Sequence, residues 1–137
     1  MLKGLAKRSR PGRQWRFFYR AFNAHEFSSS ADFTTDDWQP IHPGGGWKRG
    51  RNEVLVELKA VHGSFLKGAT DAAESMAVTS AGPGVAVVTV ISKMSAFTMP
   101  NGVAHRNDRQ IGTFVVVKRA SRWPILLDQN TTVIRTP

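Results

Sequence analysis

Four polar residues have the side-chain types that proton-transfer chemistry needs, namely His42, His62, Asp128 and Asn130. His42 precedes a Pro43-Gly44 turn. Because a histidine titrates near neutral pH, it can accept and return a proton without a large change in its pKa. His42 is therefore a candidate for proton transfer in a pocket. The alternative is a partly exposed loop histidine beside a glycine-rich turn.

Asp128 and Asn130 lie two positions apart in an expected strand, so their side chains share one face. The preceding Leu126 and Leu127 indicate burial, and a buried aspartate needs either a partner or a raised pKa. We interpret Asp128 as an acid or orienting group and Asn130 as a donor to developing oxyanion charge. The alternative is a structural carboxylate that bonds to Asn130, to the backbone or to a dimer partner.

His62 falls on the apolar face of an expected helix over residues 51–66, one turn after Leu58. It is a candidate second donor, and the alternative is a satisfied core histidine. If His42, His62 and Asp128 converge, they can polarise a carbonyl or hold a water molecule. Their spacing matches no metal-binding motif, so neither a metal nor a cofactor is expected.

Several large side chains are candidates for the walls of an apolar pocket. For the aromatic ones the alternative is plain core packing, and in a small domain the two roles can coincide. Gln110 belongs to a polar run over residues 105–110 and is expected at the pocket rim. The candidate ligand-binding residues are Phe18, Trp38, Trp47, Phe65, Met94, Gln110 and Phe114.

The elements that must position these residues are expected to be helices in the first half of the chain and strands in the second half, because the spacing of apolar residues changes between the two halves. Trp15, Phe18, Tyr19 and Phe22 follow the spacing of one helix face, whereas residues 85–94 form a β-branched run. Asn101-Gly102 predicts a hairpin turn. The expected elements are helices over about residues 15–22, 27–34 and 51–66, a short strand over 38–42, and four long antiparallel strands over 70–81, 85–94, 105–118 and 122–133. The sequence thus predicts an α+β fold with its helices on one face of the sheet.

Positive charge is concentrated at the start of the chain, where residues 1–20 hold seven of the 19 Lys and Arg residues and no acid. The other 12 basic and 10 acidic residues leave the remainder with a charge of only +2. Residues 1–13 are therefore predicted as a flexible basic arm and residues 14–137 as one domain. Nucleic-acid binding through the arm is the weakest of three functional hypotheses, because the body is nearly neutral.

Composition excludes several classes of function. The chain has no cysteine, which rules out disulfides, a thiolate nucleophile and Cys-ligated metals. It also has no apolar run of membrane-spanning length and no signal-peptide pattern, so we expect no membrane span and a cytoplasmic location. Serine-hydrolase elbows, P-loops and dinucleotide fingerprints are absent from the sequence.

Ordered motifs along residues 14–132 resemble the nuclear-transport-factor-2-like superfamily. They are Phe18-Tyr19-Arg20-Ala21-Phe22-Asn23-Ala24-His25-Glu26, Phe33-Thr34-Thr35-Asp36-Asp37, Gly46-Trp47-Lys48-Arg49-Gly50-Arg51, Thr113-Phe114-Val115-Val116-Val117-Lys118, Trp123-Pro124-Ile125 and Asp128-Gln129-Asn130-Thr131. The nearest branch is the SnoaL-like group, which includes polyketide cyclases and SgcJ/EcaC-type proteins. The resemblance implies a cystatin-like, cone-shaped α+β barrel, in which a curved mixed or antiparallel sheet packs against three N-terminal helices. It also implies an apolar pocket and a homodimer formed through the sheet.

The same resemblance suggests roles for single residues. His42 stands where ketosteroid-isomerase-like members carry a general-base aspartate, and Asp128 is similar in position to the acid/base aspartate of SnoaL-like cyclases. Phe18 stands where ketosteroid isomerases have an oxyanion-stabilising tyrosine, so that interaction is not expected. Pro124 departs from the family's polar residue and predicts a strand edge or bulge.

The leading hypothesis is a protein that binds a small apolar or aromatic ligand and acts on it as a cofactor-free isomerase, cyclase, dehydratase or hydrolase. A non-catalytic binding or carrier protein is the alternative.

Overall fold

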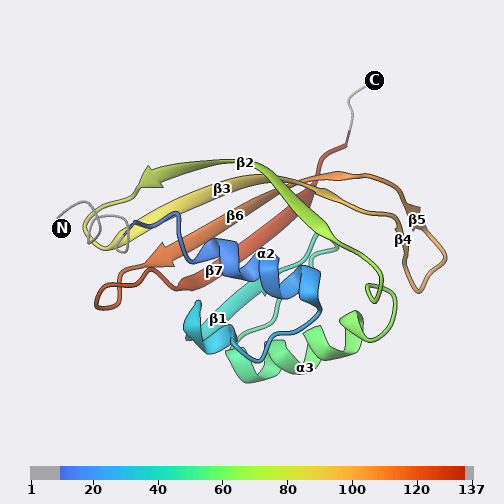
Figure 1. The fold of residues 1–137 in the computed structure, drawn as a ribbon, viewed down its shortest axis with the longest axis horizontal. Coiled ribbons are helices and arrows are strands. Elements are labelled where there is room, and N and C mark those ends of the chain that lie inside the picture. The colour runs from blue at the N-terminus through green and yellow to red at the C-terminus, as the bar shows by residue number, and fades with distance from the viewer. Residues whose placement is uncertain (1–9, 135–137) are drawn as a thin grey trace.

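The computed structural model describes residues 10–134, so most of the predicted basic arm over residues 1–13 lies outside the described residues. One face of the sheet is covered by the helices (Figure 1). The elements in chain order are α2 (Trp15–Ala24), the short 3₁₀ helix η1 (Ser30–Asp32), β1 (Thr34–Ile41), α3 (Arg51–His62), β2 (Asp71–Ser80), β3 (Val85–Met94), β4 (Phe97–Thr98), β5 (Ala104–His105), β6 (Arg109–Val117) and β7 (Ile125–Thr132).

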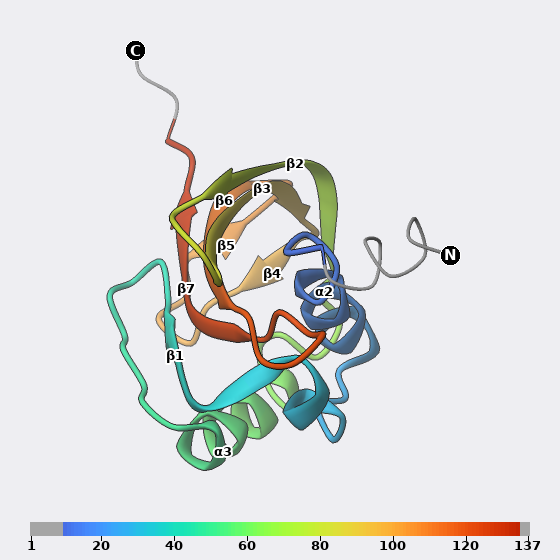
Figure 2. The same cartoon turned by 90° about the vertical axis from the view of Figure 1, so that its left-hand side faces the viewer.

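The main sheet has five strands in the order β1-β7-β6-β3-β2, and β4 and β5 form a separate hairpin. All neighbours in the main sheet are antiparallel except β1, which runs parallel to β7. In Figure 2 the sheet curls from β2 through β7 to β1, with α2 on its concave side and α3 beside β1. The predicted α+β fold with a curved mixed sheet is confirmed, although β1 and β2 remain open edges and the barrel does not close.

Four expected elements differ from the structure, and one of them is the strand expected over residues 105–118, of which only Arg109–Val117 forms a long strand, β6. The expected helix over residues 27–34 is only the single turn η1, because the chain enters strand β1 at Thr34. The third helix ends at His62, since Gly63 follows as its C-cap. The expected short strand over residues 38–42 is the eight-residue β1, which makes the long strands five in number and the sheet mixed.

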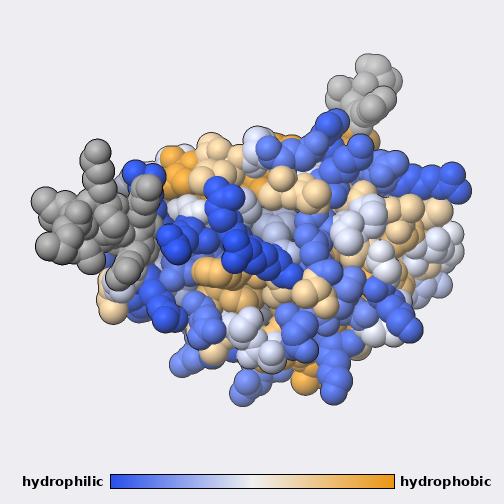
Figure 3. Space-filling view, viewed as in Figure 1, coloured by the Kyte–Doolittle hydropathy of each residue, from blue (hydrophilic) through white to orange (hydrophobic). Residues whose placement is uncertain are grey.

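The helix α2 is amphipathic, and its aromatic stripe fills the space under the sheet. The ring of Phe18 lies 5.7 Å from that of Phe114 and 6.3 Å from that of Trp38, centroid to centroid. Arg16 and Arg20 face outward on the opposite side of the helix. Hydrophilic side chains accordingly cover most of the face that carries α2, with apolar areas between them (Figure 3).

The irregularity predicted at Pro124 is present as a bulge two residues later, at Leu126 of β7. The register between β6 and β7 shifts between Val115 and Val116, and the Val117 N–H donates to the Pro124 carbonyl. No helix within residues 10–134 is long and apolar enough to cross a membrane.

Candidate functional site

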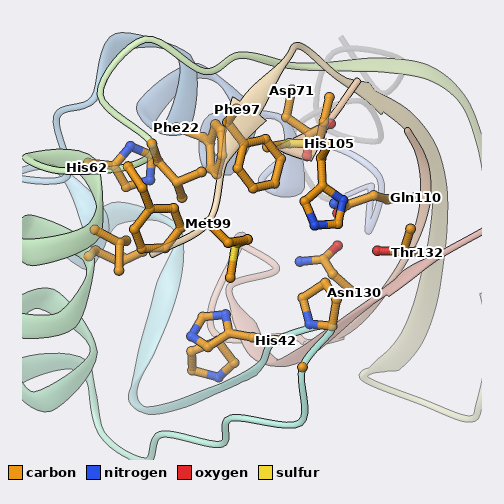
Figure 4. Close-up of a pocket in the computed structure, with 18 of the residues that line it drawn as sticks. Phe22, His42, His62, Asp71, Phe97, Met99, His105, Gln110, Asn130 and Thr132 are labelled. Carbon is orange, nitrogen blue, oxygen red and sulfur yellow. The ribbon is translucent and has the colours of Figure 1, made fainter. Parts of the chain in front are cut away.

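A cavity of about 580 Å³ lies between the helices, the concave face of the sheet and the β4–β5 hairpin. Phe22 and His62 line one end, and Met99 of the hairpin lies between them and the polar residues in Figure 4. His105 and Asn130 lie with those polar residues toward the other end. The cavity therefore has an apolar part and a polar part, as sites for small molecules generally do.

The polar part of the cavity is formed by alternate side chains of strand β7. On β7, Asp128, Asn130 and Thr132 all face the cavity, because residues two apart share one face. Their inward neighbours on β6 are Phe114, Gly112 and Gln110 in that order. Gly112 has no side chain, and a Cβ there would lie 2.9 Å from Asn130 Oδ1. The glycine therefore leaves the room that the Asn130 side chain uses.

Asp128 is a buried acid with a single described donor. It is 1% exposed, and the Trp38 indole N–H donates to its Oδ2 at 2.6 Å. Burial raises the pKa of Asp128 to about 7, and the indole hydrogen bond opposes part of that rise. A carboxyl group with this pKa can donate a proton near neutral pH.

His42 follows the end of β1 and interacts through Nε2 with Glu57 of α3. The turn after it is closed by backbone bonds, because the His42 N–H donates to the Gly46 carbonyl and the His42 carbonyl accepts from Gly45. Lys48 Nζ lies 3.6 Å from the other Glu57 oxygen. The carboxylate orients the ring and can stabilise it when protonated, and it leaves Nδ1 available to a substrate.

His62 lies at the apolar end, edge-on to Phe22, with ring centroids 4.6 Å apart. Its Nδ1 is 2.8 Å from Nδ1 of His25, and its Nε2 is buried without a partner among the described residues. Burial, followed by the nearby His25, lowers the pKa of His62 to about 4, so it is neutral at physiological pH. A neutral imidazole here can still donate a hydrogen bond to a ligand.

His42, His62 and Asp128 thus line one cavity, but each has its own partner and they do not form a bonded cluster. No group of three metal-ligating side chains occurs within the part of the chain that the structure describes.

Most expected wall residues line the cavity, and two do not. Phe18, Trp38, Phe65, Met94 and Gln110 line it. Trp47 is a correction, because it is 52% exposed, packs under Arg49 and donates from its indole N–H to Gln39. Phe114 is the second correction, because it is fully buried in the core behind Phe18 and Tyr19.

Several polar groups at the site were missed by sequence reasoning. Asp71, the first residue of β2, lines the cavity at 4% exposure, and its backbone N–H and carbonyl are both bonded to the Asn23 side chain of α2. Burial raises the pKa of Asp71. His105, the first residue of the polar run over residues 105–110, also lines the cavity, with Nδ1 2.6 Å from Asp108 Oδ2. The carboxylate three positions after His105 was the one visible signal.

Comparison with known proteins identifies the fold. Neither a protein-family model nor a curated protein matches this chain. Solved structures do match. An uncharacterised protein with a cystatin-like fold from Caulobacter vibrioides aligns with a TM-score of 0.81 at 20% identity, over 85% of this chain and 82% of that one.

Two further neighbours carry proposed activities. A proposed ketosteroid isomerase from Shewanella frigidimarina has a TM-score of 0.70 at 20% identity, over 88% of this chain and 94% of that one. A proposed scytalone dehydratase from Novosphingobium aromaticivorans has a TM-score of 0.68 at 14% identity, over 89% and 80%. The predicted cystatin-like, nuclear-transport-factor-2-like fold is confirmed, since an NTF2-like protein with a cystatin-like fold also aligns, with a TM-score of 0.77 at 12% identity. At these identities the likeness is one of fold.

Proposed function

On the premise of a nuclear-transport-factor-2-like fold, we propose that this protein binds a small, mostly apolar molecule and catalyses proton transfer next to a carbonyl group without a cofactor. The observation that carries the proposal is that the His42–Glu57 pair and the buried acid Asp128 line the same apolar cavity. A base and an acid on different elements can act on two atoms of one bound substrate.

In this mechanism His42 Nδ1 takes the proton from the carbon next to the carbonyl, and Glu57 stabilises the resulting imidazolium. The protonated Asp128 donates to the carbonyl oxygen as negative charge develops there, with the Asn130 amide as a second donor. Return of this proton from the imidazolium to another carbon of a conjugated enol gives isomerisation. Its transfer instead to a hydroxyl on the carbon next to the deprotonated one lets that hydroxyl leave as water and gives dehydration. The neighbours described as a proposed isomerase and a proposed dehydratase support this reaction class.

The proposal is tested with β-tetralone, an apolar bicyclic ketone small enough to enter the cavity of about 580 Å³. We expect the protein to accelerate exchange of its α-hydrogens for deuterium in D₂O, followed by NMR, at least about a hundredfold over an equal concentration of imidazole. Binding of the ketone with no exchange above imidazole would favour a non-catalytic carrier. Absence of both binding and exchange would reject the pocket function.

We also propose that two copies of the chain associate through the outer face of the sheet. Register places uncharged residues in rows across this face. One row is Thr79, Val87, Val115 and Leu127, and the next is Ala77, Thr89, Thr113 and Gln129. A broad uncharged strand face of this kind suits self-association better than solvent.

Val87→Lys tests this dimer, because it places a charge in the middle of the uncharged face. We expect the variant to sediment as a monomer at concentrations at which the wild-type protein is a dimer. Val56→Lys is the matched control, since Val56 is 74% exposed on α3 and away from the sheet. A wild-type monomer, or a dimer that Val87→Lys leaves intact, would contradict the proposed interface.

A further inference from the structure

Four buried polar atoms near the polar end of the cavity make no hydrogen bond of good geometry within the described residues, although the Ser92 hydroxyl interacts with the side chains of Asp71 and Tyr19. The four atoms are Tyr19 Oη, Asp71 Oδ1, Ser92 Oγ and Asn130 Oδ1. The side chains of Tyr19, Asp71 and Ser92 are 5%, 4% and 0% exposed, so bulk water does not satisfy them. A buried polar atom left unpaired costs about 1–3 kcal/mol, so a group of them calls for an explanation, and a bound ligand that supplies the missing hydrogen bonds is one.

These atoms are close to one another. The space that a Cβ on Gly112 would occupy is bordered by Asn130 Oδ1 at 2.9 Å and Tyr19 Oη at 3.2 Å. Ser92 lies on the inward face of β3, opposite Gln110 of β6, and Asp71 begins the next strand along the sheet. Asp71 and Asn130 line the cavity, and Figure 4 shows both among the polar residues at one end of it.

The four atoms favour a ligand group that donates hydrogen bonds. Asp71 Oδ1 and Asn130 Oδ1 can only accept hydrogen bonds, and the hydroxyls of Tyr19 and Ser92 can accept as well as donate. An ammonium group has three N–H donors and no acceptor, which matches this set. A carboxylate or phosphate would instead bring further acceptors and like charge against Asp71.

The charges that line the cavity also favour a cationic ligand. The chain has 19 Lys and Arg residues, yet none of the described residues that line the cavity is Lys or Arg. Glu57 already has a cationic neighbour, because Lys48 Nζ lies 3.6 Å from its carboxylate. Asp71 and Asp128 have no cationic side chain within ion-pair distance in the described range 10–134. The aromatic rings of the wall, Phe18 and Trp38 among them, also favour a cation over an anion.

We propose that the polar end of the cavity binds the protonated amine of an otherwise apolar ligand, with Asp71 as its counter-ion and Asn130 as an acceptor, while Tyr19 and Ser92 lie behind them. This inference rests on the proposed ligand-binding function and names the ligand class for the same cavity.

The test compares three probes of one shape, β-aminotetralin, β-tetralol and the matching tetralin β-carboxylate. Affinities are measured near neutral pH by isothermal titration calorimetry. We expect the amine to bind at least about tenfold tighter than the alcohol, because its bonds are charge-assisted, and the carboxylate to bind weakest. Asp71→Asn should remove about tenfold of the amine's affinity and leave the alcohol within about twofold.

Glu74→Gln is the matched control, because Glu74 is a carboxylate on the same strand that pairs with Arg109 at the surface. It should leave all three affinities unchanged. Equal or tighter binding of the alcohol or the carboxylate would overturn the amine inference alone, whereas no binding of any probe would overturn the pocket function with it. Should Asp71→Asn fail to fold, the order of the three affinities in the wild-type protein decides by itself.

Discussion

We expect His42→Gln to lower the rate of α-hydrogen exchange in bound β-tetralone by at least about a hundredfold, the usual contribution of a general base. Glutamine keeps a side-chain donor for Glu57 and has a similar length, so the turn at residues 42–46 should hold its shape. It cannot accept a proton at neutral pH, so only the chemical step is lost. The ketone should therefore bind with unchanged affinity while the exchange rate measured by NMR falls.

Variants of two glutamates of α3 distinguish a specific effect of Glu57 on His42 from a general effect of removing negative charge. Glu57 contacts His42, whereas Glu53 lies one turn earlier on the same helix and is exposed. Glu57→Gln should reduce exchange less than His42→Gln does, because it removes only the stabilisation of the imidazolium. Glu53→Gln should have no effect. Exchange that survives His42→Gln undiminished would remove His42 from the mechanism.

The periodic parts of this fold could be predicted from the sequence. The aromatic stripe of α2 repeats with the helical period, and the β-branched run of β3 fills the strand from Val85 to Met94. The length of strand β1 was underestimated because Asp36 and Asp37 interrupt its apolar pattern. As an edge strand it tolerates these acids, since both point to solvent.

The candidate site could be predicted only in part. His42, His62 and Asp128 were found from their residue types and their place in an expected element. Asp71 was missed because its strand is a weak alternation of small residues, which does not show which side faces inward. The unpaired oxygens depend on Gly112, whose missing side chain matters only once Tyr19 and Asn130 are packed against it from different elements. Contacts of this kind are set by tertiary packing and leave no local pattern.

The buried carboxyl of Asp128 should make the protein less stable as the pH rises. Its pKa is raised from 3.8 to about 7 in the folded state, so between these values the folded chain holds a proton that the unfolded chain has released. The stabilisation is complete below the unfolded pKa and is lost as the pH rises through the folded pKa. A shift of this size corresponds to about 4 kcal/mol.

Asp128→Asn removes this dependence, because asparagine keeps an oxygen that can accept from Trp38 but never ionises. We expect urea unfolding to give similar stabilities for variant and wild type near pH 4. At pH 8 the variant should be more stable by about 2–4 kcal/mol. Taking the difference between the two proteins cancels other titrations, including that of His62. The pKa of His62 is lowered to about 4, so His62 contributes stability that increases with pH.

Asp37→Asn provides the control, because Asp37 is exposed next to Trp38 on the same strand. It should leave the pH dependence unchanged. A difference between wild type and Asp128→Asn that stays constant from pH 4 to pH 8 would mean that Asp128 does not hold a proton at neutral pH. The proposed acid would then be lost from the mechanism, since an ionised carboxylate beside the carbonyl oxygen would oppose the negative charge that has to develop there.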